Sequence, residues 1–116
     1  MGTGHYVLAQ ALQELGELEE ARGHYRRALD IFIKTWNGKH ERVSAAALAL
    51  AEVLRELGET DAVLGLYQQA LDVDEELDPG GKYLVETLET FADFLDESGD
   101  AAGAQRLRQR AREMRQ

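Results

Sequence analysis

The sequence predicts an all-α protein built from three helical hairpins. A stretch spanning residues 15–31, LGELEEARGHYRRALDI, returns 42 residues later at 57–73 as LGETDAVLGLYQQALDV, and a weaker copy occupies 98–112. Apolar residues recur every three or four positions, and no stretch alternates with a period of two. Because only a few residues separate consecutive helices, neighbouring helices must run antiparallel. Each copy of the repeat is therefore expected to form one hairpin.

Glycines mark the predicted turn inside each hairpin. Gly16, Gly58 and Gly99 stand at equivalent places in the three copies, where a left-handed residue closes a helix. Asp100 then follows as a predicted N-cap. Asn37-Gly38 and the run 78–81, Asp-Pro-Gly-Gly, separate the hairpins. The predicted helices therefore span about 3–15, 17–36, 41–57, 60–77 and 82–97, with a sixth after residue 100.

The core is predicted on one apolar stripe of each helix. In the first helix, this stripe consists of Leu8, Leu12 and Leu15. Small residues are expected where the two helices of a hairpin touch: Ala9, Ala51 and Ala92. Tyr25 and Tyr67 are large enough to reach the next hairpin. A single hairpin cannot bury such a stripe alone, so the three are expected to stack.

Composition excludes several classes of function. The 116 residues contain no Cys, which rules out disulfides, Cys-bound zinc and Cys nucleophiles and is compatible with an expected cytoplasmic location. The longest apolar run, residues 45–51, is too short to span a membrane. The net charge is −9, although residues 101–116 carry five Arg and one Glu. The remaining acidic body repels phosphates, so nucleic acid is not an expected partner. Because no apolar run is long enough to span a membrane, a membrane is not an expected partner either.

Metal-binding patterns are absent from the sequence. His5, His24 and His40 lie far apart and form no His-x3-His pair, so we expect no metal site. The acidic run Asp72, Asp74, Glu76 and Asp78 resembles the start of a calcium loop. Leu77, however, stands where such a loop needs glycine, so this run is interpreted as a solvated helix end.

Catalytic motifs are absent as well. Ser44 and Ser98 are the only serines, and neither lies in a nucleophile motif. The triplet at 80–82, Gly-Gly-Lys, lacks the spacing of a phosphate-binding loop. We therefore expect no enzymatic activity and no cofactor.

The repeated residues resemble the tetratricopeptide repeat family. The second helix of that repeat reads Ala-x3-aromatic-x2-Ala-Leu, found here as Ala21, Tyr25, Ala28 and Leu29, and again as Val63, Tyr67, Ala70 and Leu71. The first helix of the repeat carries a small residue between two large ones, found here as Leu8-Ala9-x2-Leu12, Leu50-Ala51-x2-Leu54 and Phe91-Ala92-x2-Leu95.

The repeat spacing of 42 and then 41 residues resembles the longer subclass found in kinesin light chains. The first linker keeps Ile31, Gly38, His40 and Val43 of that subclass, although Glu41 replaces its usual Pro. The resemblance implies a single array, 1–116, that forms a right-handed α-solenoid with repeats at about 3–36, 41–77 and 82–115. HEAT-like hairpins have a similar period and are the alternative fold, but they lack the Ala-x3-Tyr-x2-Ala spacing.

The resemblance also implies a protein-interaction module whose first helices line a concave groove. The groove positions are Tyr6, Val7, Gln10, Leu48, Glu52, Arg55, Glu86, Glu89, Asp93 and Asp96. Their polarity changes from neutral to acidic along the groove, which favours a basic peptide; the alternative is that the acids are only a solvated helix face. Family members that clamp a peptide carboxylate use Lys, Arg and Asn here, so that activity is not expected.

The sixth helix leads to a prediction about assembly. Arg108 stands where the first two repeats have Tyr25 and Tyr67, and Arg112 follows one turn later. A polar end would keep a repeat array soluble. The same arginines could bind the acidic third-repeat groove of another copy, giving weak, salt-sensitive head-to-tail association. The competing class of function is structural: a capping or stacking segment of a longer array that binds no peptide.

Overall fold

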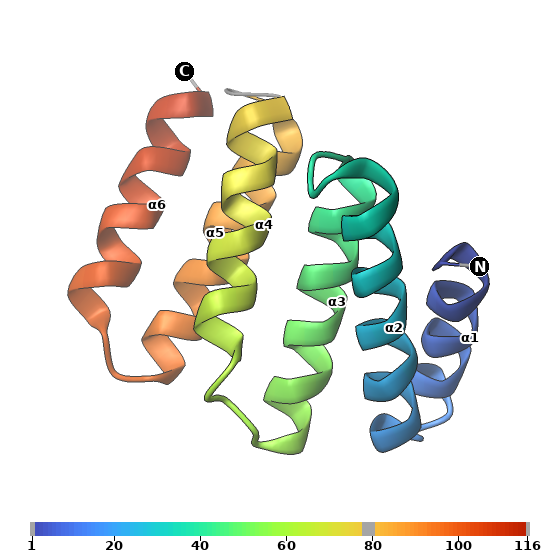
Figure 1. The fold of residues 1–116 in the computed structure, drawn as a ribbon. Helices are drawn as coiled ribbons and strands as arrows, with labels where there is room; N and C mark the ends of the chain where they lie inside the picture. Colours follow the sequence, from blue (N-terminus) through green and yellow to red (C-terminus); the bar gives the residue numbers. More distant parts are fainter. Residues whose placement is uncertain (1, 78–80, 116) are drawn as a thin grey trace.

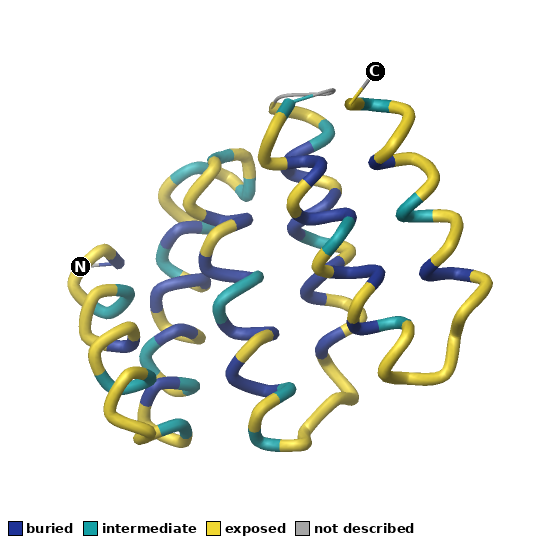
Figure 2. The backbone as a smooth tube through the Cα atoms, turned by 180° about the vertical axis from the view of Figure 1, so that it is seen from behind, coloured by how far each residue is buried: buried dark blue, intermediate teal, exposed yellow. Residues whose placement is uncertain are grey.

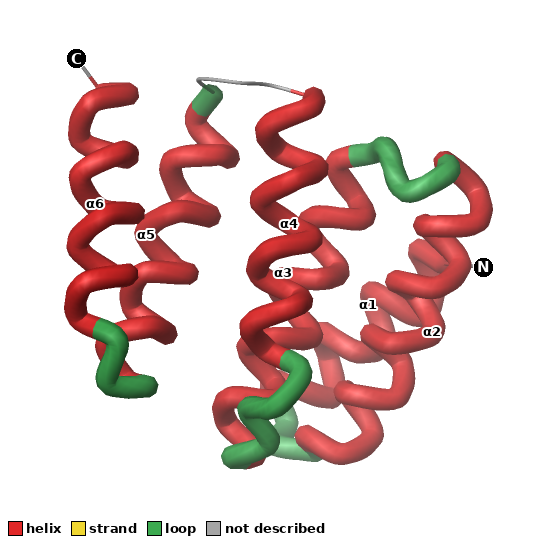
Figure 3. The backbone as a smooth tube through the Cα atoms, turned by 60° about the vertical axis from the view of Figure 1, so that its left-hand side comes forward, coloured by secondary structure: helices red, strands yellow, loops and turns green. Residues whose placement is uncertain are grey.

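The computed structural model describes residues 2–77 and 81–115, and in these residues every regular element is a helix (Figure 3). The helices are α1 (Gly2–Glu14), α2 (Leu18–Trp36), α3 (Glu41–Leu57), α4 (Val63–Leu77), α5 (Lys82–Glu97) and α6 (Ala101–Arg115). They form three antiparallel hairpins, α1–α2, α3–α4 and α5–α6, stacked in a row with the two termini at opposite ends (Figure 1). The predicted all-α architecture of stacked hairpins is confirmed.

The turns inside the hairpins follow the predicted glycines. Gly58 has a φ of 77°, and its N–H donates to the carbonyl groups of Arg55 and Leu54 at the end of α3. Gly16 and Gly99 also have positive φ angles, 83° and 89°. The carboxylate of Asp100 accepts a hydrogen bond of 2.9 Å from the backbone N–H of Gly103, which confirms the predicted N-cap of α6.

One predicted boundary is wrong. The fourth helix was expected from about residue 60, but α4 begins at Val63. Residues 60–62 precede it without regular helical structure, and the N–H of Val63 donates to the carbonyl of Thr60 in a turn. A run of polar residues after Gly58 forms this turn before the apolar stripe begins. The predicted break at Asp78, Pro79 and Gly80 lies outside the described residues.

The core runs along the middle of the stack (Figure 2). Ala9, Ala51 and Ala92 have no exposed surface, as expected for residues where two helices approach closely. Tyr67 is fully buried and stacks on Phe91 of the next hairpin, with ring centroids 5.4 Å apart. Tyr67 therefore joins neighbouring hairpins, as predicted, whereas the ring contact of Tyr25 with Tyr6 and its hydrogen bond to Gln13 lie within its own hairpin.

The predicted stripe of the first helix is partly wrong. Leu8 and Leu15 are exposed, whereas Ala9 is buried and Leu12 is half-buried. Leu15 lies in the turn after α1 and not in the helix. For Leu8 the reason is the position of α1 at the end of the row (Figure 1), where α2 packs on one side of it and no described helix packs on the other. A leucine on the outer side therefore stays in contact with solvent even though its spacing fits the stripe.

Candidate functional site

Two pockets lie in series along the side of the molecule formed by α1, α3 and α5, here called the A-helix face. The first pocket, between α1 and α3, has a volume of about 290 Å³ and is lined by Thr3, Tyr6, Val7, Gln10, Phe32, Arg42 and Ala45. The second pocket, between α3 and α5, has a volume of about 360 Å³ and is lined by Glu41, Arg42, Ser44, Ala45, Leu48, Asp74, Tyr83, Glu86, Thr87 and Thr90. Both pockets lie where consecutive hairpins meet.

The two pockets are related by the sequence repeat. In the repeat of 42 residues, Leu48 of the second pocket is equivalent to Tyr6 of the first, and Asp74 is equivalent to Phe32. In the repeat of 41 residues, Glu86 is equivalent to Ala45. The same backbone arrangement therefore presents different side chains at each step, so the two pockets differ in the chemistry of the ligand they suit.

The sequence-predicted groove residues fall into two groups in the structure. Tyr6, Val7 and Gln10 line the first pocket, and Leu48 and Glu86 line the second. The other predicted residues lie outside both pockets, on the later turns of α3 and α5: Glu52, Arg55, Glu89, Asp93 and Asp96. The structure thus brings the predicted apolar residues to the pockets and most of the predicted charges to the surface beyond them.

The first pocket is apolar and aromatic. The ring of Tyr6 meets that of Tyr25 edge to face at 5.6 Å between centroids, and lies 6.5 Å from that of Phe32. Burial raises the pKa of Tyr6, and the nearby carboxylate of Glu52 raises this pKa further. Val7 is 56% exposed at the pocket. An apolar side chain from a partner could cover Val7 and reach the aromatic wall.

Each hairpin contains one polar contact at the same repeat position. The Tyr25 hydroxyl donates to Oε1 of Gln13 over 2.8 Å, and in the second hairpin Nη1 of Arg55 donates to the Tyr67 hydroxyl over 2.8 Å. In the third hairpin Arg108 donates to Asp96. In each of the three pairs, the two residues are 12 positions apart in the sequence. Each repeat therefore has a hydrogen bond between its two helices at the same place, although the donor and the acceptor differ.

Arg55, predicted as a groove residue, instead joins the second and third hairpins. Its guanidinium pairs with Glu97 at 2.5 Å and lies 5.6 Å from the centre of the Phe94 ring, while its side chain is only 19% exposed. The hydrogen bond with Glu97 is the main cause that raises the pKa of Arg55. A charge held in this way stabilises the stack and is poorly placed to meet a ligand.

The acidic row on α5 is paired with arginines of α6. Arg108 bonds to both Asp93, at 2.8 Å, and Asp96, and Arg115 pairs with Glu89 at 2.5 Å. These two aspartates raise the pKa of Arg108. The sequence predicts an open anionic surface here, but the structure places cations of the same chain on it. Arg108, predicted to be available to another copy, is engaged within its own chain.

Sequence reasoning missed six residues that line the second pocket: Glu41, Arg42, Ser44, Asp74, Tyr83 and Thr87. Asp74 is 6% exposed and Thr87 is 1% exposed, and the Thr87 hydroxyl donates to Oδ2 of Asp74 over 2.5 Å. The available signal was the repeat itself, because a carboxylate stands at 74 where the first copy has Phe32. That substitution places a charged residue at a core position.

The histidines also show a contact that sequence separation did not predict. Nδ1 of His5 and Nδ1 of His24 lie 3.0 Å apart, so one ring donates to the other across the first hairpin. Within residues 2–77 and 81–115, no group of three His, Cys, Asp or Glu side chains is arranged to hold a metal ion. In the acidic run of α4, Asp72 and Glu76 are exposed; Asp72 accepts from Gln68, and Glu76 pairs with Lys39. The interpretation of this run as a solvated helix end is wrong for Asp74, which is buried.

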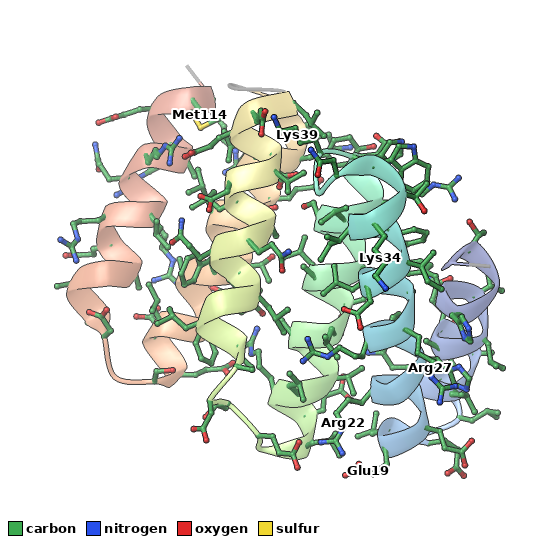
Figure 4. The ribbon with its side chains drawn as sticks, in the orientation of Figure 1. Glu19, Arg22, Arg27, Lys34, Lys39 and Met114 are labelled. Carbon is green, nitrogen blue, oxygen red and sulfur yellow. The ribbon has the colours of Figure 1, made fainter. Side chains whose placement is uncertain are left out.

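The other side of the molecule is more polar. Figure 4 shows charged side chains along α2, with Arg22, Arg27 and Lys34 labelled. A larger, open depression of about 730 Å³ lies between α2 and the turn 58–62, where Arg22 pairs with Glu59. Its lining is more polar than that of either pocket on the A-helix face, so it offers a weaker apolar anchor. None of the helices in the described ranges is long and apolar enough to cross a membrane.

Stacked helical hairpins with a pocket at each junction define an α-solenoid of the helical-repeat class, whose members present such faces to other proteins. The chain belongs to the tetratricopeptide repeat family, whose sequence profile matches residues 1–76. The family is typically non-catalytic and generally provides protein–protein interaction modules. The predicted family is confirmed in place of the HEAT-like alternative. No curated protein sequence matches the chain.

Solved structures of kinesin-light-chain-like proteins share this fold. The structure of BtubC (BKLC) from P. vanneervenii has a TM-score of 0.91 and 21% identity, and the match covers 98% of this chain and 45% of that one. Two structures of a Podosopora anserina putative kinesin light chain with nearly identical TPR-like repeats have TM-scores of 0.84, with 20% and 21% identity. These matches cover 97% and 98% of this chain and 54% and 55% of those chains. The chain therefore spans about half the length of these structures.

Proposed function

We propose that this chain binds a peptide segment of a partner protein along its A-helix face, without catalysis. The observation that supports this proposal most directly is the pair of pockets at successive hairpin junctions. Val7 is exposed at the first pocket and Tyr83 at the second. Because both pockets lie on one side of the molecule, a single segment could place one side chain in each.

The charge of this face favours a basic segment. Glu52 lies on α3, is exposed, and forms no ion pair with any residue that the structure describes. Its field reaches Tyr6, whose pKa it raises. Glu41 and Glu86 add negative charge at the second pocket. Such charges steer association and select partners more than they add affinity.

Nuclear magnetic resonance tests the proposal with a panel of capped, soluble peptides that combine one apolar and one basic residue. We expect shifts in the amide signals of the pocket residues Tyr6, Val7, Leu48 and Thr87. Glu52→Lys should weaken binding of the basic peptides, because it reverses an unpaired charge. The matched control is Glu20→Lys on α2, an exposed residue away from both pockets. Shifts confined to α2, α4 and α6, or no shifts with any peptide, would contradict the proposed binding face.

The structural alternative is supported by the outer side of α6. Arg108, Arg112 and Arg115 occupy the positions that Tyr67, Leu71 and Asp74 hold in the preceding repeat. Arg108 and Arg115 pair with acids of α5, and Arg112 donates to Gln109 of its own helix. This polar surface suits the end of a stack, so a capping role for the third hairpin is compatible with peptide binding by the first two junctions.

A further inference from the structure

Comparison of the two hairpin junctions shows two changes among their buried residues. Phe32 and Ala46 belong to the first junction, and the repeat places Asp74 and Thr87 at the equivalent positions of the second. All four residues are buried. An aromatic ring and a methyl group have thus been replaced by a carboxylate and a hydroxyl. The two polar residues form a hydrogen bond with each other, of 2.5 Å, across the junction of α4 and α5.

The carboxylate of Asp74 is only partly satisfied by the protein. Thr87 bonds to Oδ2, and no described residue forms an ion pair with Asp74 or a further hydrogen bond to its side chain. No described side-chain nitrogen or oxygen is both fully buried and unbonded, so Oδ1 retains contact with solvent. Because Asp74 lines the second pocket, that contact opens into the pocket. Because the residue Asp74 is only 6% exposed, its carboxylate has limited contact with water and gains from a cationic donor.

Two cations, one that lines the second pocket and one on the first turn of α5, contact groups other than Asp74. Arg42 donates to the hydroxyl of Thr3 over 2.5 Å, and its guanidinium lies 6.0 Å from the Trp36 ring, on the side of the first pocket. Lys82 pairs with Glu86 at 3.9 Å on the exposed surface of α5. The charged residues that line the pocket are therefore three carboxylates, Asp74 among them, and the guanidinium of Arg42. The contacts of Arg42 direct this guanidinium away from Asp74.

The walls of the second pocket suit the stem of a long side chain. Leu48 and Ala45 form an apolar wall on α3, and Tyr83, which is 61% exposed, lies on α5. A lysine or arginine stem packs on apolar surface while its charged end reaches a polar group. An exposed aromatic ring also attracts a cation. An apolar side chain in the same place would leave the carboxylate without a donor and would remove it from water.

We propose that the second pocket binds a basic side chain, arginine or lysine, of the partner segment, with its cation donating to Asp74 at the base. The proposal rests on the proposed function and specifies how the partner segment is held. The segment would place a cationic side chain at the α3–α5 junction and an apolar side chain at the α1–α3 junction. Arginine should be the better ligand, because its planar guanidinium can donate to the carboxylate through two N–H groups.

The test uses the full chain and a fluorescein-labelled, capped heptapeptide with one arginine between two leucines, flanked by glycine and serine. A second peptide carries citrulline, which keeps the shape of arginine and removes its charge. Fluorescence anisotropy gives the affinity of each peptide, and amide shifts of Tyr83 and Thr87 locate the side chain. We expect the arginine peptide to bind about tenfold more tightly than the citrulline peptide.

Two variants separate binding from folding. Asp74→Asn keeps the shape and an acceptor for Thr87, and it should abolish the preference for arginine. Asp72→Asn is the matched control, because it removes the same charge from an exposed position on the same helix and should leave the preference intact. Asp74→Phe introduces the residue found at position 32 and should convert the pocket to one that binds an apolar side chain.

The outcomes distinguish this proposal from the proposed function. If both peptides bind equally and shift the signals of Tyr6 and Val7, the A-helix face binds peptides but the cation pocket is refuted. An unchanged arginine preference in a folded Asp74→Asn protein also refutes it, because Asp74 would then be only a partner for Thr87. Absence of any binding on the A-helix face refutes both proposals.

Discussion

Replacement of Arg55 by methionine should loosen the junction between the second and third hairpins. Arg55 donates to the Tyr67 hydroxyl, pairs with Glu97 and lies against the Phe94 ring, so it joins α3 to α4 and α5. Methionine keeps much of the apolar stem while removing the charge and all five donors. The substitution therefore tests the polar contacts more than the packing.

The expected loss follows from those contacts. A hydrogen bond from a charged donor contributes about 1.5–3 kcal/mol, and the cation over an aromatic ring adds about 0.5–1 kcal/mol. The pair with Glu97 adds less, about 0.5 kcal/mol, because that carboxylate is mostly exposed. These terms overlap, so we expect the free energy of unfolding to fall by roughly 2–4 kcal/mol.

Urea unfolding followed by circular dichroism measures this loss, and hydrogen exchange locates it. Exchange should accelerate more in α5 and α6 than in α1 and α2, because repeats are coupled only to their neighbours. The control is Arg27→Met, at an exposed position of α2 (Figure 4), which should change the free energy of unfolding by less than about 0.5 kcal/mol. Equal effects of the two substitutions, or uniform acceleration over all six helices, would refute the assignment of Arg55 as the link between hairpins.

Two further predictions concern pH and assembly. Burial, followed by the fields of Tyr6 and several carboxylates, raises the pKa of Tyr25 to about 12, so the unfolded chain loses this proton near pH 10 while the folded chain keeps it. Stability should therefore fall between about pH 10 and 12, and the part of this fall due to Tyr25, roughly 1–2 kcal/mol, should be missing in Tyr25→Phe. Urea unfolding of both proteins at pH 7 and pH 11 measures the fall in each, and an equal fall in the two proteins would disprove this origin. Because Arg108 satisfies Asp93 and Asp96 within its own chain, we expect sedimentation velocity to show a monomer at low and high salt. A low-salt oligomer that Arg108→Glu abolishes would instead support head-to-tail association.

The sequence alone was sufficient to predict the three hairpins and the small residues at which their helices touch. Helix boundaries depend on nearby residues, such as Gly58 at the end of α3 and Asp100 at the start of α6, and these effects act within one turn. The repeat then equated Ala9 with Ala51 and Ala92, which identified the closely packed positions of all three hairpins. Tyr67 could be predicted to reach its neighbour because one large residue recurred at a fixed place in a recurring unit.

The tertiary structure decided which charges are available and where the pockets lie. Arg108 pairs with Asp93, and Arg55 with Glu97, only because of how α5 packs against α6 and α3. From the sequence, α5 can be recognised only as an acidic helix and α6 only as a basic one. The position of Asp74 at the base of a pocket likewise depends on the angle between hairpins. Local sequence determines helices and turns because their hydrogen bonds join residues a few positions apart, whereas charge pairing and pocket shape arise between side chains that only packing brings together.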